Sequence, residues 1–71
     1  MIGHIRKQLA RTPFVPFSIR TSNGHEYPVL TRDHAHISSR GNRVVVFTDE
    51  GAAAILGPIH INSVIEQSNG V

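Results

Sequence analysis

The stretch FSIRTSNGHEYPVL, residues 17–30, decides the fold. Phe17 and Ile19 alternate with polar residues, and this period of two predicts a strand. Asn23-Gly24 follows, and an Asn-Gly pair between strand-like runs is the strongest short signal for a hairpin, because both residues tolerate a positive φ. A partner strand is therefore expected directly after the turn. The chain should begin its β-structure with this hairpin.

Further short β-prone runs follow the hairpin, separated by tight turns. Pro28 has no N–H to donate, so its strand belongs at an edge or a bulge. Val44-Val45-Val46-Phe47 is apolar on both faces, which indicates a central strand. The core covers one of its faces, and the helix or a neighbouring chain covers the other. Pro58–Ile61 predicts a single helical turn. The expected strands are 17–21, 26–30, 34–38, 43–48 and 52–56, with 62–67 either as a sixth strand or closing the fifth.

The N-terminal segment predicts a helix over 1–11. Ile2, Ile5 and Leu9 recur at helical spacing, and this apolar stripe must dock on something because so short a helix is marginal alone. Thr12-Pro13 ends the helix, since the residue before a proline is pushed out of the helical region.

The whole chain, 1–71, is expected to form one domain, since it is too short for two. The fold class is mainly β. A short helix and an extended connector over 12–16 precede a strongly bent antiparallel sheet or small barrel over 17–67, with a tail at 68–71. The chain has no cysteine, so disulfides and thiolate metal sites are excluded. A domain this small is marginally stable, and self-association is the commonest remaining support.

Three segments together resemble a group of short bacterial proteins of unknown function. These are the Pro-Phe-x-Pro-Phe-x-Ile opening at 13–19, the polar-Gly turn at 23–27, and the Val-Val-Val strand with its acidic-Gly turn at 44–51. The resemblance spans 13–66. It implies no activity, because the group has none attached to it.

The expected architecture, a helix followed by a five-stranded bent sheet, is similar to the Sm-like and SH3-type small barrels. Sm-like proteins form rings that bind single-stranded RNA, through an Asp and an Asn in one loop and an Arg-Gly pair in a later loop. Asp33 and Arg40-Gly41 match two of these roles. Only six residues separate them, where a strand pair is expected, and the Asn is missing. The resemblance therefore implies the fold more directly than RNA binding.

His34-x-His36 is the sharpest candidate metal site. Two residues apart on a strand, both imidazoles would face one side and share a zinc ion. Asp33 is a candidate third ligand, and His25 or His60 a fourth. The alternative is a solvated strand face with two ordinary histidines, and no cofactor is predicted.

A cationic cluster is the candidate nucleic-acid site. The chain carries a formal net charge of +2, and every charged residue before Glu26 is basic. Nucleic-acid modules combine such charges with exposed aromatic rings, for which Tyr27 and Phe14 are the candidates. The alternative is a surface that only keeps the protein soluble. The cluster comprises Arg6, Lys7, Arg11, Arg20, Arg40 and Arg43.

The sequence favours a protein that is not an enzyme. Asp33, His36 and Ser38 supply the residue types of a hydrolase triad, but no nucleophile elbow or oxyanion hole accompanies them. The interior of so small a barrel is filled by its own side chains, so no small-molecule substrate is predicted. The N-terminus has neither a long apolar run nor a cleavage site of small residues, and no stretch is long enough to cross a membrane. A cytoplasmic protein is expected.

These observations predict a small non-enzymatic binding or assembly module that forms a homo-oligomer. The alternative function is single-stranded RNA binding of the Sm-like kind, through the basic N-terminal face.

Overall fold

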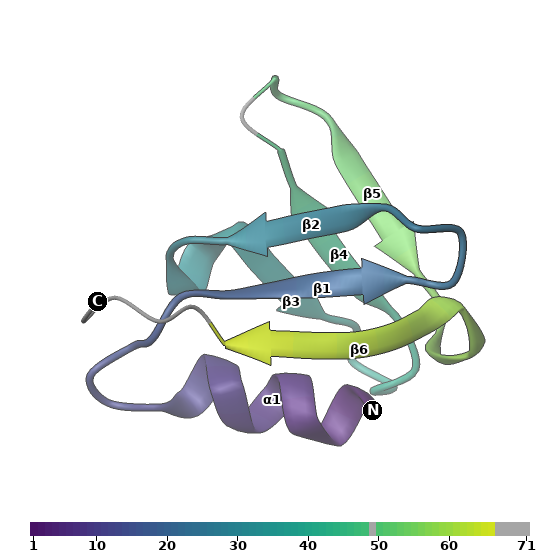
Figure 1. The fold of residues 1–71 in the computed structure, drawn as a ribbon. Helices are drawn as coiled ribbons and strands as arrows, with labels where there is room; N and C mark the ends of the chain where they lie inside the picture. Colours follow the sequence, from purple (N-terminus) through teal and green to yellow (C-terminus); the bar gives the residue numbers. More distant parts are fainter. Residues whose placement is uncertain (49, 67–71) are drawn as a thin grey trace.

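The structure is a computed structural model and describes residues 1–48 and 50–66 (Figure 1). Within these residues a single α-helix comes first and six strands follow, with a 3-10 turn before the third strand and another before the sixth. The elements are α1 (Ile2–Ala10), β1 (Phe17–Thr21), β2 (Glu26–Val29), η1 (Arg32–His34), β3 (Ala35–Ile37), β4 (Val44–Phe47), β5 (Ala53–Leu56), η2 (Pro58–His60) and β6 (Ile61–Glu66). The prediction of a mainly β fold behind one helix is confirmed.

The strands form two three-stranded antiparallel sheets, in the orders β2-β1-β6 and β3-β4-β5. Within the described residues no strand pairing joins the two sheets, so they do not close into a barrel. Figure 1 shows the strands of the second sheet crossing behind those of the first. Pro28 lies on β2, an edge strand as predicted, and β4 is central in its sheet as predicted.

The hairpin of residues 17–30 forms as the sequence indicates. Phe17 pairs with Val29 and Ile19 with Tyr27, and Gly24 adopts a φ of 88° in the turn. On its other side β1 pairs with β6, so the first and last strands of the chain lie side by side. This pairing makes β1 the central strand of the first sheet.

The core lies between the two sheets and α1. Its largest fully buried side chains belong to the hairpin, the helix and β4: Phe17, Ile5, Ile19, Val29, Val44 and Val46. Alternation places Phe17 and Ile19 of β1 and Val44 and Val46 of β4 inside, so each of these two strands supplies two buried apolar residues.

Helix α1 covers one side of this core and packs against β3. Ile2 and Ile5 are buried and Leu9 packs against the core, which confirms the predicted apolar stripe. Gln8 is buried as well, and its side chain contacts His4 Nε2 at 3.4 Å and accepts a hydrogen bond from Arg11. The polar Gln8 was not expected on the buried face.

The start of the third strand differs from the prediction. A strand was expected over 34–38, but β3 spans Ala35–Ile37 and His34 ends the turn η1. The backbone N–H of Thr31 donates to Nδ1 of His34 at 3.2 Å, so the imidazole closes the turn before the strand begins. The predicted tail, 68–71, and residue 67 lie outside the described residues.

Candidate interaction surfaces

The second sheet presents an apolar face away from the core. Because side chains alternate along a strand, the residues that neighbour the buried Val44, Val46 and Leu56 along their strands point outward. Val45 lies opposite Ile55, and Phe47 lies opposite Ala53. We call this surface the outer face; it consists of His36, Val45, Phe47, Ala53 and Ile55.

The outer face is substantially exposed. Ile55 is 69% exposed and Phe47 is 46% exposed, whereas a β-branched or aromatic side chain usually finds a packing partner in a sheet. A shallow hollow of about 330 Å³ lies on this face beside Val45 and Phe47, with Arg32 and Asp33 at its rim. The prediction that the β4 strand is apolar on both faces is confirmed, and its second face is left partly open.

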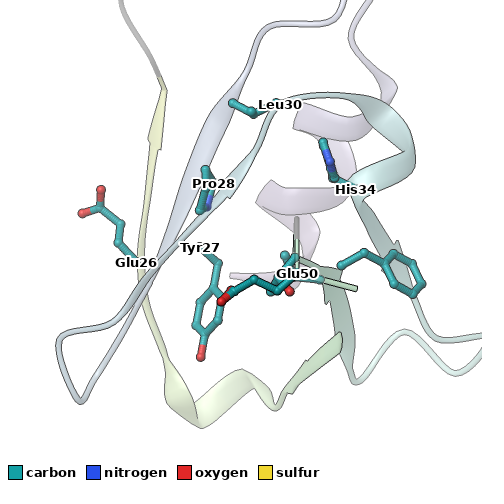
Figure 2. A pocket seen from close by; sticks show the side chains of 9 residues that line it. Glu26, Tyr27, Pro28, Leu30, His34 and Glu50 are labelled. Carbon is teal, nitrogen blue, oxygen red and sulfur yellow. The ribbon is translucent and has the colours of Figure 1, made fainter. Parts of the chain in front are cut away.

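A second hollow of about 290 Å³ lies between β2 and the end of β4 (Figure 2). Tyr27 and Glu50 both line it, while Glu26 turns its carboxylate away (Figure 2). Arg20 holds Glu26 in that position, with Nη2 donating to Oε1 at 2.8 Å. The wall is mainly apolar and the hollow is open to solvent.

The two histidines of the candidate metal site line different hollows. His34 faces the hollow beside Tyr27, and its Nδ1 accepts the N–H of Thr31. His36 stands on β3, in the wall of the hollow on the outer face. Their predicted geometry required both residues on one strand, and only His36 is. Within the described part of the chain, no group of three His, Cys, Asp or Glu side chains could hold a metal ion.

Ser38, the candidate nucleophile, anchors the turn between β3 and β4. Its hydroxyl donates to Oδ1 of Asn42 and accepts the backbone N–H groups of Asn42 and Arg43, at 3.1 to 3.3 Å. Asp33 and His36 both line the hollow on the outer face. The Ser38 hydroxyl thus serves the turn rather than that hollow.

Folding neutralises two members of the cationic cluster. Nη1 of Arg11 donates to Oε1 of Glu66 at 2.7 Å, and Arg20 is paired with Glu26. Lys7 of α1 and Arg11, which directly follows α1, line a shallow hollow together with His4. The first third of the sequence contains only basic charges, but in the fold two of its arginines form ion pairs with acidic residues of later strands.

Arg40 and Arg43 lie in the segment between β3 and β4, and Arg6 reaches that segment from α1. We call these three residues the arginine corner. Nη2 of Arg6 lies 3.0 Å from the point that a Cβ on Gly41 would occupy, so the helix reaches this turn. The guanidinium of Arg43 lies over Gly57 and donates to the carbonyl oxygen of Asn42 at 2.7 Å. No ion pair joins the corner to a carboxylate among the described residues.

The two aromatic rings considered for base stacking are both half-buried. Phe14 packs against Phe17, with ring centroids 6.1 Å apart, and the guanidinium carbon of Arg32 lies 5.5 Å from the Phe14 centroid. Tyr27 packs beside His25. The Phe14 face is therefore occupied within the chain, and Tyr27 lies on the hairpin rather than at the arginine corner.

Arg32 is a structural residue that sequence reasoning missed. Its Nε donates to the carbonyl oxygen of Leu9 at 2.8 Å, and Nη2 donates to the carbonyl oxygen of Arg11. These hydrogen bonds join residues far apart in the chain, so no local sequence pattern predicts them.

Comparisons of the chain with protein-family models, with curated proteins and with solved structures found no match. No helix in the described residues has both the length and the apolar character needed to cross a membrane.

Proposed function

We propose that this chain is a non-enzymatic assembly module that self-associates through the second sheet. The observation that carries the proposal is the exposure of Ile55 on β5, which shares the outer face with the exposed Phe47. A domain of 71 residues buries a small core, and packing Ile55 beside a side chain of a second copy would add to it.

Sedimentation equilibrium of the purified chain tests this proposal. Ile55→Lys places a charge in the middle of the apolar outer face and should weaken association at least tenfold. Ile59→Lys is the matched control, because Ile59 is 85% exposed on η2 and lies outside that face. Equal association constants for both variants would show that the outer face does not take part in self-association.

The second candidate is single-stranded RNA binding, favoured by one observation, the gathering of Arg6 with the turn that carries Arg40 and Arg43. Unpaired guanidinium groups attract phosphate, and the affinity then falls with salt as counterions are released. An oligomeric ring would repeat the arginine corner around its rim, which would strengthen such binding.

Fluorescence anisotropy with a single-stranded RNA at several salt concentrations tests this candidate. Arg43→Ala should lower the affinity and reduce the salt slope by about one unit. Arg11→Ala is the control, because Arg11 is already paired with Glu66. Absence of binding by the unaltered chain at low salt would end this proposal.

The finer fold assignment is also part of the proposal. The turn η1 joins β2 directly to β3, so these two strands would count as one bent strand shared by both sheets, as in an SH3-type or Sm-like barrel. Five strands would then remain, in the order β6, β1, β2 with β3, β4 and β5. Cross-strand nuclear Overhauser effects running without a break from β2 through η1 into β3 would support this assignment, and two ladders separated at η1 would contradict it.

A further inference from the structure

We propose that two copies of this chain pair through β5, edge to edge and antiparallel, about a two-fold axis at Ala54. The inference rests on the proposed self-association and names the strand, the register and the symmetry. Three observations support it: the features that protect the other strand edges from pairing, the direction of the backbone groups of β5, and the side chains that the register brings together.

Among the edge strands that the structure describes, β5 has neither a proline nor a charged side chain, and the first hairpin turn and η2 border it only at its C-terminal end, where they line a hollow with Ile55 and Leu56. Natural edge strands are protected by proline, by charged side chains or by a covering helix. Strand β2 carries Pro28, α1 packs against β3, and β6 ends in Glu66, which is paired with Arg11. The sequence from 52 to 57 is Ala-Ala-Ala-Ile-Leu-Gly, with no charge and no proline. This strand stands at the far end of its sheet from β3 (Figure 1).

The hydrogen bonds next to β5 fix which of its backbone groups point outward. The N–H of Thr48 donates to the carbonyl oxygen of Ala52 at 2.9 Å, so these residues form a hydrogen-bonded pair. Such pairs alternate along an antiparallel ladder. Val46 with Ala54 is therefore the next hydrogen-bonded pair, and the N–H and C=O groups of Ala53 and Ile55 point to the free edge.

The register with its axis at Ala54 uses these groups without disturbing the chain, and the registers centred on Ala53 and Ile55 do not. With the axis at Ala54, Ala53 of each copy pairs with Ile55 of the other, and both residues offer outward N–H and C=O groups. With the axis at Ala53, Ile55 would have to pair with Gly51, whose N–H already donates to the carbonyl oxygen of Thr48 at 3.0 Å. With the axis at Ile55, Ala53 would have to pair with Gly57. The carbonyl oxygen of Gly57 already accepts the N–H of His60 at 3.0 Å. A shift of one residue would oppose outward groups with inward ones.

The side chains agree with the register centred on Ala54. It places the large Ile55 opposite the small Ala53 of the second copy, on the same side of the joined sheet. Val45, which lies opposite Ile55 within one copy, extends this into an apolar stripe across both copies. The strand that pairs is short and buries little area, so the dimer should form and dissociate with concentration.

Disulfide trapping tests the register, because the chain has no cysteine of its own. Ala54→Cys should cross-link readily under mild oxidation, since the two Ala54 residues form a non-hydrogen-bonded pair with Cα atoms about 4.5 Å apart. Ile55→Cys is the control, because its copies lie diagonally, at about 7 to 8 Å. Cross-linking of Ile55→Cys in preference to Ala54→Cys would overturn the register.

Ile55→Pro tests the backbone pairing in solution. Proline removes the outward N–H and leaves the ladder to β4 intact, so the variant should keep its circular-dichroism spectrum and lose at least tenfold in association. Leu56→Pro removes an N–H that points toward β4 and should unfold the sheet. Its circular-dichroism spectrum therefore serves as the reference for a disrupted pairing with β4. An oligomer that persists in Ile55→Pro, with no cross-link from Ala54→Cys, overturns the edge pairing while self-association stands. A parent chain that is monomeric overturns both the self-association and the edge pairing. If the parent chain has a mass greater than that of a dimer, and Ile55→Pro has the same mass, the two-fold pairing is overturned.

Discussion

Nε of Arg32 donates a hydrogen bond to the carbonyl oxygen of Leu9 at 2.8 Å, which ties the turn before β3 to the end of α1. The last carbonyl groups of a helix lack partners within the helix, and a cation there also complements the helix dipole. The same guanidinium lies over the ring of Phe14. One side chain thus fixes both the helix and the connector on the sheet.

We expect Arg32→Ala to lower the free energy of unfolding by about 1–2 kcal/mol, through loss of the hydrogen bonds to the helix end and of the contact with Phe14. Urea denaturation measures this directly. Arg40→Ala is the control, because Arg40 is exposed and should change stability by less than about 0.5 kcal/mol. Equal effects at the two positions would show that Arg32 does not anchor the helix.

Two glycines should respond to alanine in opposite directions. Gly41 has a φ of 73° and the guanidinium of Arg6 beside it, so Gly41→Ala should cost about 1–2 kcal/mol. Gly3 lies in α1 with open space where a Cβ would stand, so Gly3→Ala should stabilise the protein by about 0.5–1 kcal/mol. Thermal unfolding of the two variants checks the signs. A gain at Gly41 would contradict the turn geometry.

The same chemical change should separate the core from the surface. Ile5 is fully buried in α1, and Ile5→Val should cost about 0.5–1.5 kcal/mol by removing one packed methylene. Ile59→Val, at a position that is 85% exposed, should leave the free energy of unfolding unchanged within error. Equal midpoints in urea for Ile5→Val and the parent chain would mean that α1 does not dock as described.

The elements that the sequence predicted best are those with local signals. Asn23-Gly24 defines the first hairpin, Pro58 begins the predicted helical turn, and the spacing of Ile2 and Ile5 identifies the buried face of the helix. Each of these depends on residues close together in the chain, so the pattern carries the information. The position of Pro28 on an edge strand follows in the same way.

Contacts between distant residues were not predictable from the sequence. Arg11 and Glu66 come together only because β6 pairs with β1, and the pair removes a charge from the expected basic face. The start of β3 was misplaced because the ring of His34 accepts the N–H of Thr31, which competes with strand pairing. The apolar run of β4 predicted the outer face. How much of that face is exposed to solvent depends on where α1 packs, and the sequence does not specify this position.

Light scattering of the parent chain over a range of concentrations tests the central claim, self-association, most directly. The chain has a mass of 7.8 kDa, and the account predicts that the measured mass rises with concentration toward 2 × 7.8 = 15.6 kDa. A mass of 7.8 kDa at every concentration up to about 1 mM, where even an interaction of about −4.1 kcal/mol would be visible, would contradict it.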